Sequence, residues 1–535
     1  MGVLRRSMIA AAALAIGASG SAFADEPRYG GILNYVVPGD PPSYDGHQES
    51  TFAVIHPVAP FYSTLIKVNP ENPSDADDVV CDLCVGKVPE PTENGTLYTF
   101  KIHKGVKFHD GETLDAHDLV ATYNHIINPP EGVLSVRKAY FEMVEKVYAS
   151  DDHTFVIKLK YPTAAFLPSL ASPYDFVYSN ERLAKDPNWY KTNILGSGAF
   201  VLDKREPGAL ISGVKFKDYH IKGRPYLDGF NAIFANKQSL RVQAIRGGRA
   251  DIEFRGFPPK SRDDLVAALG DKITTQESTW NCNMTVSLNH KHPAFKDQRV
   301  RRAITLAIDR WGGSKYLSQI AIMKTVGGIV FPGHPLSATK EELEKIDGYW
   351  PDIEKSRAEA KRLLKEAGFE NLSFTLVNRN VDQPYKIAGT WLIGEWKKIG
   401  LNVTQKALTT GEWYRSFRET KEYEAALTPT CQSVVNPVLD VQNNLSIDRS
   451  PQNYRDYIDR EGDALYDAMG KETDKAKLRQ KMRAFEDYIL QEKSHYIIVL
   501  WWNRIIPHRS RLKGWKISPS HYLNQDLVNV WLADE

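Results

Sequence analysis

The stretch from Leu97 to Ile127 constrains the fold of this chain more than any other segment. Apolar side chains alternate with polar ones from Tyr98 to Ile102, which is the period of a half-buried strand. Asp110-Gly111 then supplies a turn, and Thr113 or Asp115 is placed to cap a helix. Apolar residues recur on one face of that helix: Leu119, Val120, Tyr123 and Ile127. The segment therefore predicts a strand, a turn and a helix in succession.

This strand, turn and helix resemble the signature of a known protein family. GVKFHDGE follows the strand and LDAHDLV opens the helix, as in the family 5 extracytoplasmic solute-binding proteins, the peptide and nickel class of ABC importers. Four later segments continue the resemblance: Asn193–Phe200, Gly248–Ile252, Leu288–Phe295 and Lys513–Trp515. It implies an α/β fold like that of periplasmic binding proteins, with two lobes joined by a hinge and mixed sheets with flanking helices.

The N-terminus predicts the compartment independently. Arg5 and Arg6 precede an apolar run from Met8 to Gly17, and small residues at 22–24 form a cleavage site before Asp25. This pattern is typical of a secretory signal peptide over residues 1–24. The run is too short to span a bilayer, and no later segment has the roughly 20 apolar residues of a membrane helix. With no cysteine near the cleavage site to take a lipid, we expect a periplasmic protein without lipid anchor or direct membrane insertion.

Length and charge limit the architecture and the partners. A chain of 535 residues is too long for one ordinary core, so at least two lobes are expected. Lys and Arg total 68 against 66 Asp and Glu, which argues against a nucleic-acid partner. The family resemblance implies lobe one at 25–279, with an inserted subdomain at roughly 61–190, lobe two at 280–504, and a return to lobe one at 505–535. We expect a monomer.

The second half of the chain alternates helices and strands, as an α/β lobe should. Helical periodicity and terminating glycines predict helices at Asp297–Asp309, at Ile353–Ala367 before Gly368, and at Tyr385–Lys398 before Gly400. Short apolar runs predict strands at Phe374–Val377, Leu401–Ala407 and Ile497–Trp502.

Four cysteines remain after removal of the signal peptide: Cys81, Cys84, Cys282 and Cys431. An even number in an oxidising compartment favours disulfides, and four cysteines allow three pairings. We predict a short Cys81–Cys84 bridge and a long-range Cys282–Cys431 bridge. Zinc is the weaker interpretation, because no second CxxC or histidine pair stands at zinc-finger spacing.

No set of residues predicts catalysis. Four histidines cluster in sequence but fall on a strand, a turn and a helix, so they are not expected to converge: His103, His109, His117 and His125. No HExxH, GxSxG or Walker motif occurs, and Gly196-Ser197-Gly198 lacks the lysine of a phosphate-binding loop, so a tight crossing between the lobes is expected there. His290 and His292 form an HxH pair, which is usually incidental. We predict no catalytic residue, metal or cofactor; a secreted two-lobed hydrolase is the alternative from another class.

The family resemblance also assigns candidate ligand contacts. In dipeptide-binding relatives an Arg before a Pro-Tyr pair grips the ligand carboxylate, but Gln383 stands at that position here. The relatives also hold the ligand ammonium with an Asp in a GDPD-like loop, and the matching stretch here ends at Asp440. Arg379 and Asp440 are predicted to substitute for the two anchors.

Aromatic residues complete the predicted cleft. We assign Tyr44, Trp413, Trp501 and Trp502 to it, with core packing an equal alternative for Trp413. Trp501 and Trp502 are adjacent on a strand, so they should face opposite sides. The predicted function is capture of a peptide or peptide-like solute between the lobes and delivery to the transmembrane subunits of an ABC permease. A non-peptide solute is the alternative: an opine, a glycoside, a metal chelate or haem.

Overall fold

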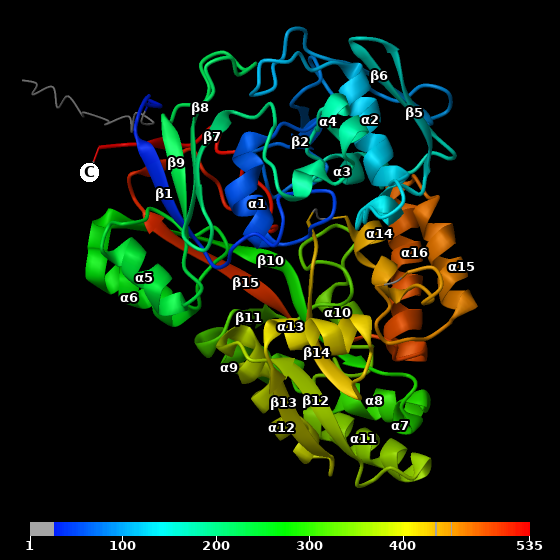
Figure 1. Cartoon of the computed structure of the whole chain (residues 1–535). Helices are drawn as coiled ribbons and strands as arrows, with labels where there is room; N and C mark the ends of the chain where they lie inside the picture. The colour runs from blue at the N-terminus through cyan, green and yellow to red at the C-terminus, as the bar shows by residue number, and fades with distance from the viewer. Residues whose placement is uncertain (1–25, 434–435, 451, 535) are drawn as a thin grey trace, which may run out of the picture.

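A computed structural model of the chain describes residues 26–433, 436–450 and 452–534 (Figure 1). The predicted signal peptide at 1–24 lies outside the described residues. Among the residues that the structure describes, no helix is both long and apolar enough to cross a membrane. The fold combines mixed sheets with flanking helices, as predicted.

A four-stranded sheet is the centre of the part that we call lobe one. Its strands lie in the order β1 (Ile32–Val37), β9 (Gly229–Phe234), β8 (Leu210–Lys215) and β7 (Phe200–Glu206). Alternate residues of β1 fill two cores on opposite faces. Tyr35 packs with α1 (Phe52–Val58) and the C-terminal segment, whereas Val36 packs with α5 (Gln238–Arg246) and α6 (Pro259–Leu269).

A smaller subdomain lies beside this sheet. It contains a three-stranded antiparallel sheet of β4 (Leu97–Lys101), β6 (Thr154–Leu159) and β5 (Val144–Asp151), and a hairpin of β2 (Ile66–Val68) and β3 (Val79–Cys81). Three helices cover it: α2 (Ala116–Ile127), α3 (Phe166–Leu170) and α4 (Asn180–Lys185). The predicted strand, turn and helix are confirmed. Of the two candidate caps, Asp115 caps α2 and forms a capping box with Asp118.

Lobe two is built on a six-stranded sheet. Its order is β11 (Met323–Thr325), β15 (Ile497–Arg509), β10 (Ile273–Leu288), β14 (Ala425–Cys431), β12 (Ser373–Arg379) and β13 (Asn402–Leu408). The helices around it are α7 (Pro293–Lys296), α8 (Gln298–Leu306), α9 (Arg310–Ile320), α10 (Lys340–Leu343), α11 (Ile353–Ala367), α12 (Ile387–Lys397), α13 (Thr410–Tyr414), α14 (Pro437–Asp440), α15 (Arg460–Gly470) and α16 (Lys475–Asp487). A two-stranded sheet of β16 (Leu512–Lys513) and β17 (Trp531–Leu532) follows near the C-terminus.

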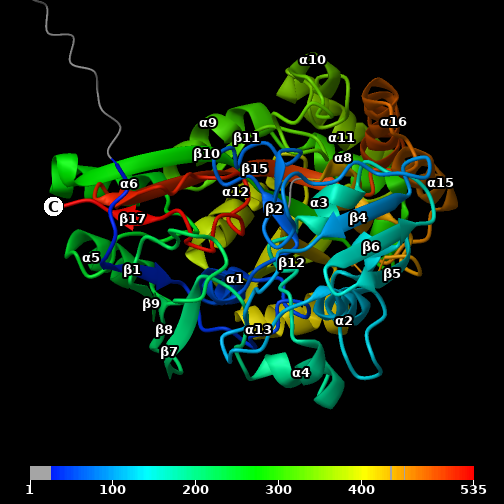
Figure 2. The ribbon, with the colours of Figure 1, turned by 90° about the horizontal axis from the view of Figure 1, so that it is seen from above.

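Strands β10 and β15 join the two lobes. They pair antiparallel from Ile273 opposite Arg509 to Val286 opposite Ile497, and Figure 2 shows them side by side along the molecule. Ile506 lies in the core of lobe one, and Val286 lies in the core of lobe two. The two strands therefore carry the main chain between the lobes, and we refer to them as the crossing strands.

The subdomain of lobe one contacts lobe two directly. The Thr163 hydroxyl of the subdomain donates a hydrogen bond to the Gly470 carbonyl at 2.8 Å, and the Asn436 amide donates to the Ala165 carbonyl at 3.2 Å. A continuous apolar core also joins the subdomain to α15 and α16. The two lobes are therefore in direct contact in this structure.

Both predicted disulfides are present. Cys81 pairs with Cys84 beside the β2–β3 hairpin, and Cys282 pairs with Cys431. The second pair occupies directly opposed positions of β10 and β14, with Cα atoms 4.2 Å apart. It therefore ties a crossing strand to the neighbouring strand of lobe two.

Several predicted boundaries shift for local reasons. The helix predicted to begin at Tyr385 begins at Ile387, because Asp382–Lys386 form a wider turn in which Gln383 is extended. The helix predicted over 297–309 ends at Leu306, and the predicted strand 497–502 continues to Arg509 as a crossing strand. Gly196 and Gly198 make the predicted close approach, since a Cβ at either position would overlap the backbone of Phe61. Phe61 lies in the lobe-one core with Leu195 and Ala199, so the approach is within lobe one and not between the lobes as predicted.

Candidate functional site

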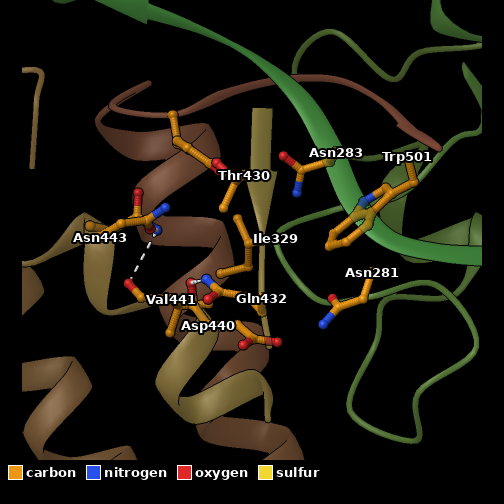
Figure 3. Close-up of a pocket in the computed structure, with 11 residues that line it drawn as sticks. Asn281, Asn283, Ile329, Thr430, Gln432, Asp440, Val441, Asn443 and Trp501 are labelled. Carbon is orange, nitrogen blue, oxygen red and sulfur yellow. Dashed lines mark hydrogen bonds between the residues drawn. The ribbon is translucent and has the colours of Figure 1, made fainter. Parts of the chain in front are cut away.

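A polar cavity lies between the crossing strands and helix α14. Its volume is about 10 Å³, which is about the room of one water molecule. Figure 3 shows Asn281, Asn283 and Trp501 on one side, facing Asp440 and Gln432. The remaining lining residues are Ile329, Thr430, Val441, Asn443, Asn444 and Tyr496. Amide groups dominate the lining, so the cavity offers both donors and acceptors of hydrogen bonds.

Oδ1 of Asn283 and Oδ2 of Asp440 are buried in this cavity and have no hydrogen-bond partner among the described residues. Burial raises the pKa of the Asp440 carboxyl well above its usual range. An unpaired buried acceptor is costly, and a bound group that donates hydrogen bonds would remove that cost. The cavity is therefore chemically suited to an amide N–H or an ammonium group.

An aromatic strip runs from lobe one to lobe two. We define it as Phe52, His521, Trp280, Trp502 and Tyr385. Successive ring centroids along it are 6.4, 5.3, 5.4 and 6.3 Å apart. Phe52 belongs to α1 in lobe one, the two tryptophans to the crossing strands, and Tyr385 to the turn before α12 in lobe two. The strip therefore crosses the junction between the lobes.

The strip and the polar cavity draw on alternate residues of the crossing strands. On β10, Trp280 joins the strip whereas Asn281 lines the cavity. On β15, Trp502 joins the strip whereas Trp501 lines the cavity and donates its Nε1–H to the Gly328 carbonyl at 3.0 Å. The period of two places these neighbours on opposite faces of the strands, so the predicted alternation of Trp501 and Trp502 is confirmed.

The strip carries one polar group with no partner. Trp280 Nε1–H donates to Nδ1 of His521 at 2.9 Å, but Nε1 of the buried Trp502 has no partner among the described residues. Tyr522, next in sequence to His521, lies within electrostatic reach of both lobes. Burial raises its pKa, Tyr414 and Tyr385 of lobe two raise it further, and Arg255 of lobe one lowers it.

Two of the predicted site residues meet at the lobe-two end of the strip. The Arg379 guanidinium lies over the ring of Tyr385 at 4.8 Å, donates to its hydroxyl at 2.9 Å, and lies 6.0 Å from the ring centre of Trp413. Trp413 is buried and stacks on Phe417 at 4.8 Å, so it packs in a small core as well as under Arg379. The structure therefore shows core packing for Trp413, and its ligand contact stays a prediction.

The other predicted residues lie apart from this group. Asp440 lines the polar cavity, whereas Arg379 lies against Tyr385 at the end of the aromatic strip, so the two residues are in different places. Gln383 donates from Nε2 to the Ile320 carbonyl at 2.8 Å. Tyr44 lies beneath the guanidinium of Arg205 in lobe one, at 4.6 Å. For all of the predicted site residues a ligand contact stays a prediction.

The clustered histidines do not converge, as predicted. Nδ1 of His125 lies 2.9 Å from Nδ1 of the buried His47, whereas His103 neighbours His220 and His117 pairs with Asp152 at 3.6 Å. Within the described ranges, no three His, Cys, Asp or Glu side chains are arranged to hold a metal ion. His290 is half-buried, and desolvation lowers its pKa, so its neutral form is favoured.

Sequence reasoning missed several residues of the strip and cavity: Trp280, Asn281, Asn283, Arg255 and His521. The sequence held a signal for the first three. They flank Cys282, which was predicted to form a disulfide, and neighbouring residues on a strand face opposite sides. Arg255 and His521 gave no such signal, since only the tertiary fold brings them to the strip.

Comparison with known proteins identifies related sequences. The family model described as bacterial extracellular solute-binding proteins, family 5 Middle, matches residues 84–451, more than half of the chain. Oligopeptide-binding protein AppA of Bacillus subtilis (strain 168) is 24% identical over 537 residues, covering 95% of this chain and 93% of the relative.

Solved structures share the fold. The periplasmic binding protein AgaA of A. tumefaciens R10, solved with agropinic acid, has a TM-score of 0.80 at 21% identity and covers 94% of this chain and 99% of its own. DppA of Helicobacter pylori, solved with the peptide STSA, has a TM-score of 0.80 at 20% identity and covers 94% and 98%. The predicted fold class is therefore confirmed.

Proposed function

This chain belongs to family 5 of the bacterial extracellular solute-binding proteins, and from that premise we propose that it is the substrate-binding component of an ABC importer. It captures a peptide or peptide-like solute between its two lobes and delivers it to the transmembrane permease. We place the protein in the periplasm, in agreement with the signal peptide predicted from the sequence, and propose that it acts as a monomer that carries out no reaction.

The aromatic strip is the single observation that carries this proposal. Its rings come from both lobes and from the crossing strands between them, so opening the lobes would uncover rings that closure buries. Aromatic walls with a few polar groups are typical of small-molecule sites in proteins. A solute enclosed there would contact both lobes at once and so stabilise the closed form.

The polar cavity favours a peptide as the solute. Backbone N–H groups and an N-terminal ammonium are donors, and Asn283 and Asp440 hold unpartnered acceptors. An ammonium beside Asp440 would restore the charge that burial disfavours on that carboxyl. We propose that Asp440 binds the amine of the solute. Arg379, at the lobe-two end of the aromatic strip, contacts a separate acidic or carbonyl group of the solute.

A non-peptide solute is the second candidate. Gln383 cannot offer the charge-assisted fork of the arginine that dipeptide-binding relatives carry at that position. AgaA, which shares the fold, was solved with agropinic acid. The further alternatives of a glycoside, a metal chelate or haem rest on the same departure at Gln383.

Native mass spectrometry of protein purified without refolding tests the proposal, because a closed site retains its solute. We expect a bound small molecule that is released by mild denaturation, and fragmentation of that molecule to show a peptide. A non-peptide mass would favour the second candidate. Turnover of the retained molecule by the protein would contradict a pure binding function and favour the alternative of a hydrolase.

A further inference from the structure

Arg255 is a partly exposed cation at the lobe-one end of the aromatic strip. We propose that Arg255 binds an anionic group of the solute, and that the site therefore selects solutes with a free carboxylate. This inference rests on the proposed function, since it concerns the same site. No sequence pattern singled out Arg255, and its position became apparent only in the fold.

Two rings of the strip hold the Arg255 guanidinium in place. Its central carbon lies 5.1 Å from the ring centre of Phe52 and 5.5 Å from that of Trp280. A guanidinium over aromatic faces is attracted by their electron density, and its planar fork of N–H donors remains available at the edge. Phe52 belongs to lobe one and Trp280 to a crossing strand, so Arg255 faces the junction between the lobes.

The carboxylates near Arg255 in sequence have other partners. Glu253 lies 3.5 Å from Arg241 and accepts hydrogen bonds from the backbone N–H groups of Arg255 and Gly256, not from the Arg255 side chain. Asp251 pairs with Arg511 at 2.6 Å. Within the part of the chain that the structure describes, no carboxylate lies within 4 Å of the Arg255 guanidinium. The guanidinium therefore has no protein counter-ion there.

Arg255 also differs from the arginines that stabilise the fold. The guanidinium of buried Arg137 donates to the carbonyls of Gly46 and Glu49, and that of Arg310 donates to those of Thr305, Gly348 and Ile498. The structure gives the Arg255 guanidinium no such hydrogen bond among the described residues. A structural role would use those donors, whereas a ligand-binding role leaves them available.

The surroundings of Arg255 favour an anion over a neutral group. Arg504 is buried behind it and donates to the Arg255 carbonyl at 3.3 Å, so a second positive charge lies close by. Burial lowers the pKa of Arg504 to about 9, which still leaves it charged at neutral pH. Burial, together with Arg504 and Arg255, also lowers the pKa of His56 to about 3. Glu253 offsets part of this charge, since it raises the pKa of Arg504, but Arg241 also lies close enough to Arg255 for the two cations to repel each other. The remaining positive charge lowers the free energy of a bound anion.

One carboxylate chemistry could come from two sources: the C-terminus of a peptide, or a non-peptide acid. The Arg255 guanidinium could form the same bidentate pair with a carboxylate from either source. The experiment therefore uses one probe of each kind, each with its neutral amide counterpart: Ala-Ala-Ala and its C-terminal amide, and succinate and succinamide.

The test compares three forms of the full chain: wild type, Arg255→Gln and Arg224→Gln. Arg224 is the matched control, because its guanidinium also lies over an aromatic ring, at 4.0 Å from Tyr226, but away from the strip. Native mass spectrometry of unrefolded protein should find a solute that gains a methyl ester on treatment with acidic methanol, which marks a carboxylate. Arg255→Gln should retain that solute at least about tenfold less than Arg224→Gln.

Calorimetric titration with the four probes gives a second readout. Wild type and Arg224→Gln should bind the carboxylate form of at least one pair about tenfold or more tightly than its amide, and Arg255→Gln should lose that preference. A preference within the peptide pair alone would assign the carboxylate to a peptide terminus. A retained solute without an acidic group, equal retention by Arg255→Gln, or no preference for either carboxylate would overturn the inference.

These outcomes separate the inference from the proposed function. A neutral retained solute, or one held equally by Arg255→Gln, removes the role of Arg255 but leaves a solute-binding protein. If the wild type retains no solute and none of the four probes binds, the proposed function and the inference fail together. A circular-dichroism melting curve for each variant, matching that of the wild type within a few degrees, shows that lost retention does not reflect unfolding.

Discussion

Trp280 on β10 and Trp502 on β15 meet edge to face, with ring centroids 5.4 Å apart, where the two crossing strands pass between the lobes. Edge-to-face pairs of aromatic rings add to stability beyond the area that they bury. Trp280 has a partner for its indole N–H in His521, but Trp502 has none among the described residues. The pair therefore combines a packed contact with one unused donor, at the centre of the strip.

The unused donor of Trp502 leads to the first prediction. Trp396 donates its indole N–H to the Ile304 carbonyl at 3.2 Å, and Trp396→Phe removes that hydrogen bond. Trp502→Phe removes no such bond, so it should lower the free energy of unfolding by about 1 kcal/mol less than Trp396→Phe does. Both variants lose the same volume from a buried site. Urea unfolding measures the difference. Affinity for the retained solute should fall in Trp502→Phe alone, and equal affinities in the two variants would contradict a ligand role for Trp502.

Arg379 and Asp440 give the second prediction. If both contact a zwitterionic solute, Arg379→Ala and Asp440→Ala should each weaken its binding by about 2 kcal/mol or more, because each leaves a desolvated charge of the solute unpaired. Calorimetry with the identified solute measures the loss, and Arg224→Ala serves as control. Because the two residues occupy different surroundings, a variant that changes nothing would exclude that residue as an anchor without excluding the other.

The two disulfides should contribute unequally to stability. Cys282 and Cys431 are 149 residues apart, whereas Cys81 and Cys84 are three apart. In the chain-entropy model a longer closed loop removes more freedom from the unfolded chain, about 5 kcal/mol against about 2 kcal/mol here. Urea unfolding of the double serine variants should therefore show the larger loss for Cys282/Cys431. An equal or reversed order would contradict the entropic explanation.

Buried Asp175 predicts a dependence of stability on pH. Burial raises the pKa of its carboxyl to about 8, from an ordinary value of 3.8, and neither carboxylate oxygen has a hydrogen-bond partner among the described residues. The folded state thus binds the proton more tightly than the unfolded state, so stability should fall as pH rises from about 4 to about 8.

Asp175→Asn should remove this contribution, because an amide does not titrate. Its unfolding free energy should change less than that of the wild type between pH values of about 4 and about 8. The exposed Asp152→Asn should keep the wild-type slope. Identical slopes in wild type and Asp175→Asn would show that Asp175 does not titrate in this range.

Local patterns in the sequence predicted much of the fold. Asp115 caps α2 and Gly368 ends α11 with a left-handed backbone, and both signals depend on a few neighbouring residues. The Cys282–Cys431 bridge followed from an even number of cysteines and an oxidising compartment, although counting alone left three pairings open. Such features need no knowledge of distant contacts.

The site depends on contacts that no local pattern contains. Arg255 and Trp280 are 25 positions apart but meet because the segment after Asp251 is hydrogen-bonded to β15, the strand that pairs with β10. Arg379 and Asp440 were grouped because they are close in sequence, whereas the fold gives them separate surroundings. The adjacent Trp501 and Trp502 were the exception, because the period of a strand fixes their opposite faces.

Small-angle scattering of the full chain tests most directly whether a solute is enclosed between the lobes. The measurement compares protein that retains its solute with the same protein after the solute is stripped and the chain refolded. We predict a smaller radius of gyration with the solute, because closure on the strip brings the lobes together. An unchanged radius of gyration at saturation, with binding confirmed by calorimetry, would contradict enclosure between the lobes.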